Sequence, residues 1–307
     1  MSPAKKKSAP ASASSPSIFR SLFAGGGKSL LIGLLLAGVL AAGGYKIWQF
    51  VRGRVLSSEE YQLTPEKIQI SPWPPPRWVQ PDPRQEVFAQ LRRRGPISIM
   101  DETLTAERIT AAFEQNPWIA KVRKVAKKYP ATVEVAVEYR QPVLMVRIDT
   151  PSSQIYYAVD ADGISLPTEG CFDPVELRTY PCLVGVEKPP ATIAGKRWGD
   201  SRVIGGAEIA AALLPVWEKL RFKQIVPRAH SLSAPVASPD ATQSPQFGDY
   251  RFELVTQGDK HINWGKAPTD KNSPDASPAQ KVKTLEDRAS EYGSLDKCRD
   301  EIDLNRP

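Results

Sequence analysis

One apolar run near the N-terminus limits the folds open to this chain more than any other feature does. Residues 29–45 read SLLIGLLLAGVLAAGGY, which is seventeen positions without a charge. A bilayer core of about 30 Å requires roughly 20 mostly apolar residues in a helix. The run reaches this length by continuing to Val51, because the Lys46 side chain can extend its ammonium group to the interface. We therefore expect a transmembrane helix over residues 29–51.

The charges on either side of the run predict its orientation. The first 28 residues contain five basic side chains and no acidic one. These basic residues are Lys5, Lys6, Lys7, Arg20 and Lys28. Lys46, Arg52 and Arg54 on the other side weaken the bias without reversing it, so we expect the N-terminus to stay in the cytoplasm. Residues 1–28 then form a basic, disordered tail, and the bulk of the chain lies beyond the inner membrane.

Two other interpretations of this region compete with a membrane span. A cleaved secretory signal is the first, because the small residues Ala41, Ala42 and Gly43 follow the apolar stretch. The second is a phosphate-binding loop at AGGGKS, residues 24–29. Leu22 stands where that loop needs its first glycine, so we reject nucleotide binding there.

The rest of the chain is nearly neutral. The 307 residues carry a formal net charge of +7, of which +5 lies in the first 28 positions. The remaining 279 residues hold 36 basic and 34 acidic groups. Domains that bind nucleic acids usually concentrate positive charge on a folded face, so this balance argues against nucleic acid as a partner. Outside the cytoplasm, where ATP is not supplied, we expect binding, scaffolding or chemistry that needs no cofactor.

Residues 61–146 predict a strand–helix–helix–strand–strand unit. Asp82 is a suitable N-cap for the first helix, and Thr103 for the second. Alternating valines at 133, 135 and 137 indicate a strand with one buried face. The expected strands span residues 67–70, 118–126 and 133–139, and the expected helices span residues 83–94 and 104–115.

Residues 147–307 predict a mixed β-sheet domain with two helices. Asp162-Gly163 between apolar runs is a hairpin signal. The expected elements are a strand at 181–185, a helix at 206–220, hairpin strands at 251–256 and 261–264, a helix at 281–292 and a last strand at 301–304. Segments 230–248 and 266–279 have the composition of flexible inserts. The predicted fold class is α+β.

One stretch carries a family resemblance. PWIAKVRKVAKKYPATVEVAVEYRQPV, residues 117–143, resembles the end of the POTRA domain in the bacterial division proteins FtsQ and DivIB. The matching residues are Pro117, Trp118, Ile119, Val125, Lys127, Lys128, Tyr129, Pro130, Thr132, Val133, Val135, Val137, Glu138, Arg140 and Pro142. Residues 156–167, with Asp160 and Gly163, resemble a hairpin of the same family, and residues 181–185 resemble one of its strands. Tyr129 stands where the family usually has tryptophan.

The resemblance implies a single-pass scaffold of the cell inner membrane at the division site. In that family the β domain binds small bitopic coiled-coil division proteins, and the complex regulates septal peptidoglycan synthases. It implies no enzyme activity and no small-molecule substrate. The alternatives are another POTRA-containing envelope protein in secretion or outer-membrane assembly, and a secreted or membrane-anchored envelope binding protein.

We expect the partner to dock on the C-terminal helix and strand, since an unpaired edge strand can accept a partner strand. The family normally has one more strand after this element, whereas the sequence ends at Pro307. The candidate contact residues are Leu285, Arg288, Glu301, Ile302, Asp303 and Leu304.

Few residues suggest chemistry. His230 and His261 have no nucleophile placed for them, so no catalytic residue is predicted. Asp160 and Asp162 lack the downstream glutamate of a calcium loop, and no metal site is predicted. Cys171 and Cys182 either form a disulfide, closing a loop worth about 3 kcal/mol, or remain free thiols.

Overall fold

A computed structural model describes residues 27–95, 97–191, 194–229, 250–268 and 275–298, together with Ile302 and Leu304. The chain divides into two compact units, residues 1–61 and 62–307. The described residues form an α+β fold with five α-helices and two mixed sheets. The flexible insert predicted at 230–248 lies outside the described residues, as do most of the N-terminal tail and residues 269–274 of the second insert.

The described part of the first unit is dominated by one long helix, α2 (Gly27–Leu56). Its part from Leu31 to Leu56 is long and apolar enough to cross a membrane. The core helix of a soluble protein would bury its apolar side chains, whereas Leu35 is 70% exposed and Trp48 63% exposed. The helix continues five residues beyond the predicted end at Val51.

The second unit begins with a three-stranded sheet in the order β1-β3-β2. Its strands are β1 (Ile68–Ser71), β2 (Ile119–Lys128) and β3 (Thr132–Tyr139). β1 runs parallel to β3, whereas β2 and β3 form an antiparallel hairpin. The valines at 133, 135 and 137 are buried, as their alternation predicts.

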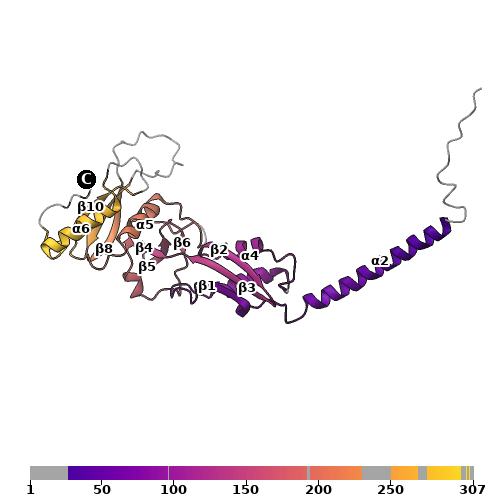
Figure 1. Ribbon diagram of the computed structural model, residues 1–307. Coiled ribbons are helices and arrows are strands. Elements are labelled where there is room, and N and C mark those ends of the chain that lie inside the picture. The colour runs from indigo at the N-terminus through magenta and orange to yellow at the C-terminus, as the bar shows by residue number, and fades with distance from the viewer. Residues whose placement is uncertain are drawn as a thin grey trace, which may run out of the picture. The chain divides into compact units, whose positions relative to one another are not determined.

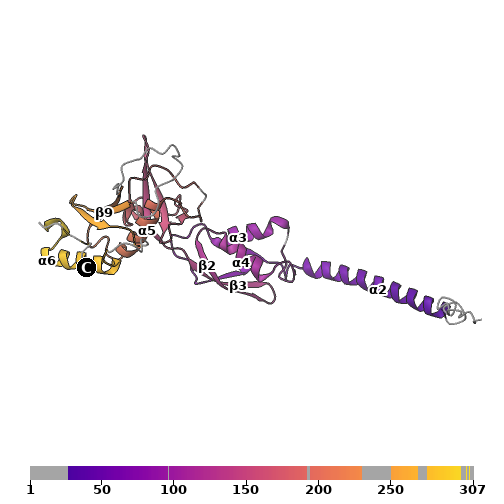
Figure 2. The ribbon, with the colours of Figure 1, turned by 90° about the horizontal axis from the view of Figure 1, so that it is seen from above.

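Two short helices cover this sheet, α3 (Pro83–Leu91) and α4 (Ala106–Glu114). α4 packs on β2, and α3 packs on α4 (Figure 2). Asp82 caps α3 as predicted, by accepting a hydrogen bond from the Arg84 backbone. The predicted cap of α4 is wrong. Thr105, not Thr103, accepts from a first-turn N–H, so the helix starts two residues later than expected.

A seven-stranded sheet follows, in the order β10-β9-β8-β7-β4-β5-β6. Of these strands, Figure 1 labels β10, β8, β4, β5 and β6. Its strands are β4 (Pro142–Asp149), β5 (Gln154–Asp160), β6 (Ser165–Leu166), β7 (Cys182–Leu183), β8 (Phe222–Ala229), β9 (Tyr250–Thr256) and β10 (His261–Gly265). β7 runs parallel to both of its neighbours, and the other pairs are antiparallel. The hairpins around Gly163 and Asp259 form where the sequence predicts them.

The helices α5 (Ser201–Leu213) and α6 (Pro278–Tyr292) pack together over this sheet, with α5 against β4 and β8. They enclose a core that includes Trp217, Phe252, Trp264 and Leu285. α5 starts five residues before the predicted position, because Asp200 caps it, and ends seven residues before the predicted position. The predicted last strand at 301–304 falls largely outside the described residues. Ile302 and Leu304 are buried and belong to no strand.

Candidate partner-binding edge

The seven-stranded sheet ends in an edge strand, β10, next to α6. Within the described residues β10 has one neighbour, β9. Its side chains alternate, since Ile262 and Trp264 are buried whereas His261 and Asn263 are exposed. One face of the strand therefore anchors it to the core, and the other faces solvent.

The main-chain groups of β10 alternate as well. Thr256 donates its backbone N–H to the Lys260 carbonyl at 3.0 Å, which directs the main chain of residue 260 toward β9. By strand alternation, the N–H and C=O groups of His261 and Asn263 point away from β9. No strand in the described part of the chain lies on that side. Among the described residues, these groups form an open strand edge.

α6 lies against this edge through a buried lysine. Lys281 is only 2% exposed, and its Nζ donates to the Trp264 carbonyl at 2.6 Å. The same ammonium lies 3.2 Å from Asp275 Oδ2 and 5.3 Å from the centroid of the Trp264 ring. A capping box between Ser277 and Gln280 starts the helix. The helix and the edge strand are thereby held as one surface.

Most of the described residues predicted to contact a partner lie inside the core instead. Leu285 is 0% exposed, Ile302 4% and Leu304 2%. They pack in the core under the sheet, because an apolar side chain gains more from burial than from exposure. Arg288 is on the surface, where it pairs with Glu291 at 3.2 Å. The predicted contacts Glu301 and Asp303 lie outside the described residues.

The sequence reasoning did not select His261 and Asn263 as contact residues. Their signal is the alternation of exposed and buried positions in HINWG, which marks a strand with one solvent face. The position of this strand at an edge depends on the order of strands in the sheet, which no local sequence pattern contains.

His261 Nδ1 lies 3.3 Å from Glu253 Oε2. Among the described residues, no group of three or more metal-binding side chains could hold an ion.

A second feature fixes the two sheets of this unit to each other. Arg140 follows β3 and Asp160 ends β5, and their side chains form an ion pair at 2.7 Å with 15% and 7% exposure. Asp160 also accepts backbone hydrogen bonds from Asp162 and Ile164 through its other oxygen. The Trp78 indole donates to the Arg140 carbonyl at 3.1 Å. These contacts fix the seven-stranded sheet next to the three-stranded sheet.

The cysteines are free thiols, so the structure lacks the disulfide considered for Cys171 and Cys182. Cys171 packs with Trp118 and Leu166, and Cys182 stands on β7 opposite Met145. Burial raises the pKa of the Cys182 thiol to about 11. A thiol that stays protonated at neutral pH is a poor nucleophile, which suits a packing role.

No protein-family model matches the chain, and no curated protein matches it.

Proposed function

We propose that this chain is a bitopic membrane scaffold of the septation machinery. α2 tethers it to the inner membrane with the N-terminus in the cytoplasm. The folded part recruits and regulates septal peptidoglycan synthesis through contacts with other proteins, and it performs no chemistry of its own.

The Arg140–Asp160 ion pair carries the proposal. These residues belong to two separate stretches that resemble motifs of the FtsQ and DivIB family, and they meet in a part-buried contact. Removing two charges from water is costly unless they are paired. In this proposal Arg140 and Asp160 have a shared structural role, because their ion pair joins the two modules of the scaffold.

The order of the elements adds support. β1, α3, α4, β2 and β3 form the strand–helix–helix–strand–strand series that the resemblance to POTRA domains implies. The larger sheet follows it along the chain, as the β domain does in that family. We therefore propose that residues 62–139 form a POTRA-like module, shorter than the predicted 61–146 because β4 (Pro142–Asp149) pairs in the seven-stranded sheet.

The partner surface in this proposal is β10 with the exposed side of α6. A partner segment adds to the outer edge of β10 through main-chain hydrogen bonds. Arg288, paired with Glu291, lies on the exposed side of α6. Small single-pass coiled-coil division proteins are the proposed partners.

Depletion of the protein tests the role in septation. A fluorescent fusion should concentrate at the division site, and depleted cells should elongate without completing septa. Diffuse localisation in the envelope together with normal septation would contradict the proposal. Loss of outer-membrane proteins or of secretion on depletion would favour the other class of POTRA-containing protein.

The edge itself is tested by His261→Pro. Proline at this first strand position removes the outward N–H while leaving the hydrogen bonds to β9. We expect capture of the division partners by the tagged full chain to fall roughly tenfold. The matched control, His261→Ala, keeps the N–H and should bind normally. Equal binding by the two variants would show that β10 is not the docking edge.

A further inference from the structure

The other end of the seven-stranded sheet has a second open edge, on β5. β6 is two residues long and pairs only with Ala158 and Val159. Residues 154–157 therefore have β4 on one side, and on the other side no strand within the described residues.

The main-chain direction along β5 follows from two hydrogen bonds. Met145 donates its N–H to the Pro181 carbonyl at 2.8 Å, away from its β5 partner Ala158. The Ala158 N–H must then point away from β4, and it donates to Thr168 Oγ1 at 2.7 Å. Alternation places the N–H and C=O of Tyr156 and Gln154 on the same outer side. At Ala158 the Thr168 hydroxyl therefore fills the outer hydrogen-bonding position. At Tyr156 and Gln154 a partner strand could fill the corresponding positions.

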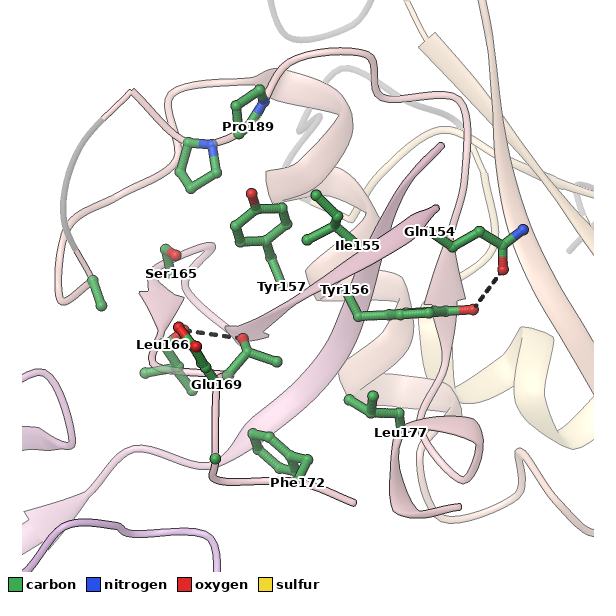
Figure 3. Close-up of a pocket in the computed structure, with 14 residues that line it drawn as sticks. Gln154, Ile155, Tyr156, Tyr157, Ser165, Leu166, Glu169, Phe172, Leu177 and Pro189 are labelled. Carbon is green, nitrogen blue, oxygen red and sulfur yellow. Dashed lines mark hydrogen bonds between the residues drawn. The ribbon is translucent and has the colours of Figure 1, made fainter. Parts of the chain in front are cut away.

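An open groove of about 690 Å³ runs beside these groups. Figure 3 shows Tyr157 and Ile155 on the side of Pro189, and Tyr156 on the side of Leu177. Side chains from both faces of β5 therefore flank the exposed edge. Ile155 is 41% exposed, so its apolar side chain is open to solvent at this edge.

The charge of the groove indicates what would fit. Glu169 is the single charged residue among those that line it, and it is exposed. In the described part of the chain no basic side chain pairs with this carboxylate. A ligand that carries a positive charge would supply the missing complement.

The shape favours one strand over a whole sheet. The segment with Pro189 and Pro190 lines one part of the groove, and Phe172 with Leu177 lines another. A second copy of this domain would have to bring its own β5 edge past both borders. A single extended segment needs only the width of one strand, about 5 Å.

We propose that this groove binds an extended segment of a partner protein. The segment adds as a strand to Gln154–Tyr157, places apolar side chains against Tyr156 and Tyr157, and directs a lysine or arginine to Glu169. This surface lies at the opposite edge from β10, and the proposal holds whether or not the protein acts in septation.

The test uses the full chain in lipid nanodiscs and a displayed library of random short peptides. We expect enriched peptides to alternate apolar and polar positions and to share one lysine or arginine. In the Glu169→Lys variant the shared basic position of the enriched peptides should become aspartate or glutamate, because the charge facing it is reversed. The variant should fold normally, since the side chain is exposed. No enrichment, or enrichment that ignores Glu169→Lys, would overturn the proposal.

The strand-addition geometry is tested separately. Tyr156→Pro removes the outward N–H and should abolish the enrichment, whereas Tyr156→Phe keeps that donor and should retain it. The thermal unfolding midpoint of each variant reports whether it is folded. If Tyr156→Pro does not fold, the Glu169→Lys result alone decides. Enrichment of proline-rich peptides, which lack strand alternation, would also overturn the proposal.

Discussion

Two partly or wholly buried cations show how single residues shape this fold. Lys281 satisfies its ammonium with the Trp264 carbonyl and Asp275, next to the Trp264 ring. Arg140 has one close carboxylate, Asp160, and its Nε has no hydrogen-bond partner. A buried pair of this kind adds little net stability compared with apolar packing, but losing one partner is costly. We infer that both cations serve to fix geometry.

Removing Arg140 should therefore destabilise the chain markedly. We expect Arg140→Met to lower the free energy of unfolding by about 3 kcal/mol, because the Asp160 carboxylate stays in a site with little water. Urea unfolding of the full chain in detergent measures this loss. Adding Asp160→Asn, which keeps an oxygen for the turn, should recover part of it.

The matched control for this prediction is Arg123→Met. Arg123 forms an ion pair with Glu138 at a surface where the side chains are 54% and 46% exposed. Its loss should cost less than about 1 kcal/mol. Equal losses for Arg140→Met and Arg123→Met would show that burial of the junction pair has no energetic effect.

The Cys182 thiol predicts a change of stability at alkaline pH. Its pKa rises to about 11 in the folded chain because of burial, whereas a thiol in an unfolded chain has a pKa of about 8.5. Between these values the unfolded chain releases the proton and the folded chain keeps it. The contribution of this thiol to folding stability should be unchanged below about pH 8 and fall by about 3 kcal/mol toward pH 11. Urea unfolding at several pH values shows this slope, and Cys182→Ala should reduce it. An unchanged slope would mean that the thiol is already solvated.

At the scale of elements, α5 approaches the sheet through a glycine. A Cβ at Gly205 would lie 2.8 Å from Phe252 Cζ, so the close contact of α5 with β9 requires a residue without a side chain. Alanine in a helix normally gains about 1 kcal/mol over glycine. At this position we expect Gly205→Ala to destabilise by about 1–3 kcal/mol instead.

The control for Gly205→Ala is a double-mutant cycle. Phe252→Leu removes the contact of the new methyl group with the ring but leaves its contact with Ala267 Cβ at 2.9 Å, so the double variant should recover part of the loss that the two single losses add up to. Thermal unfolding of the four proteins gives the coupling energy. A coupling energy of zero would show that the Gly205→Ala loss does not come from contact with the Phe252 ring.

Local signals predicted many elements and missed those that depend on distant contacts. The Asp82 cap, the alternation in β3 and the Asp162-Gly163 hairpin are each contained in a few residues. β8 was not predicted, since Pro227 interrupts its pattern and its place between β7 and β9 comes from the sheet. The start of α5 was missed because Gly205 and Gly206 interrupt the helical pattern after its Asp200 cap.

The candidate site shows the same division. The sequence predicts that the C-terminal hairpin and helix exist, and both do. It does not tell which apolar residues are buried, so Leu285, Ile302 and Leu304 were assigned to a partner although they fill the core. A helix face looks the same whether its neighbour is its own sheet or another protein.

At the scale of the whole molecule, the charge is divided along the chain. Five of the seven excess positive charges lie in the first 28 residues, before the apolar helix. The part that follows is close to neutral, and within its described residues the seven-stranded sheet has open edges at β10 and along part of β5. Such surfaces suit recognition of polypeptides, which bind through main-chain hydrogen bonds and a few side chains.

The position of those five charges leads to a prediction about membrane orientation. Replacing Lys5, Lys6, Lys7, Arg20 and Lys28 with glutamine leaves Lys46, Arg52 and Arg54 as the nearest positive charges, on the other side of the apolar run. Positive residues are retained in the cytoplasm, so a fraction of the molecules should invert. Protease added to intact spheroplasts would then spare the folded part of the inverted fraction, whereas it should digest that part of the wild type. Replacing Arg52 and Arg54 instead should leave the wild-type orientation unchanged. If the variant with five replacements also keeps the wild-type orientation, the charges of the tail do not determine it. Translocation of the large folded part would then set the orientation of the helix.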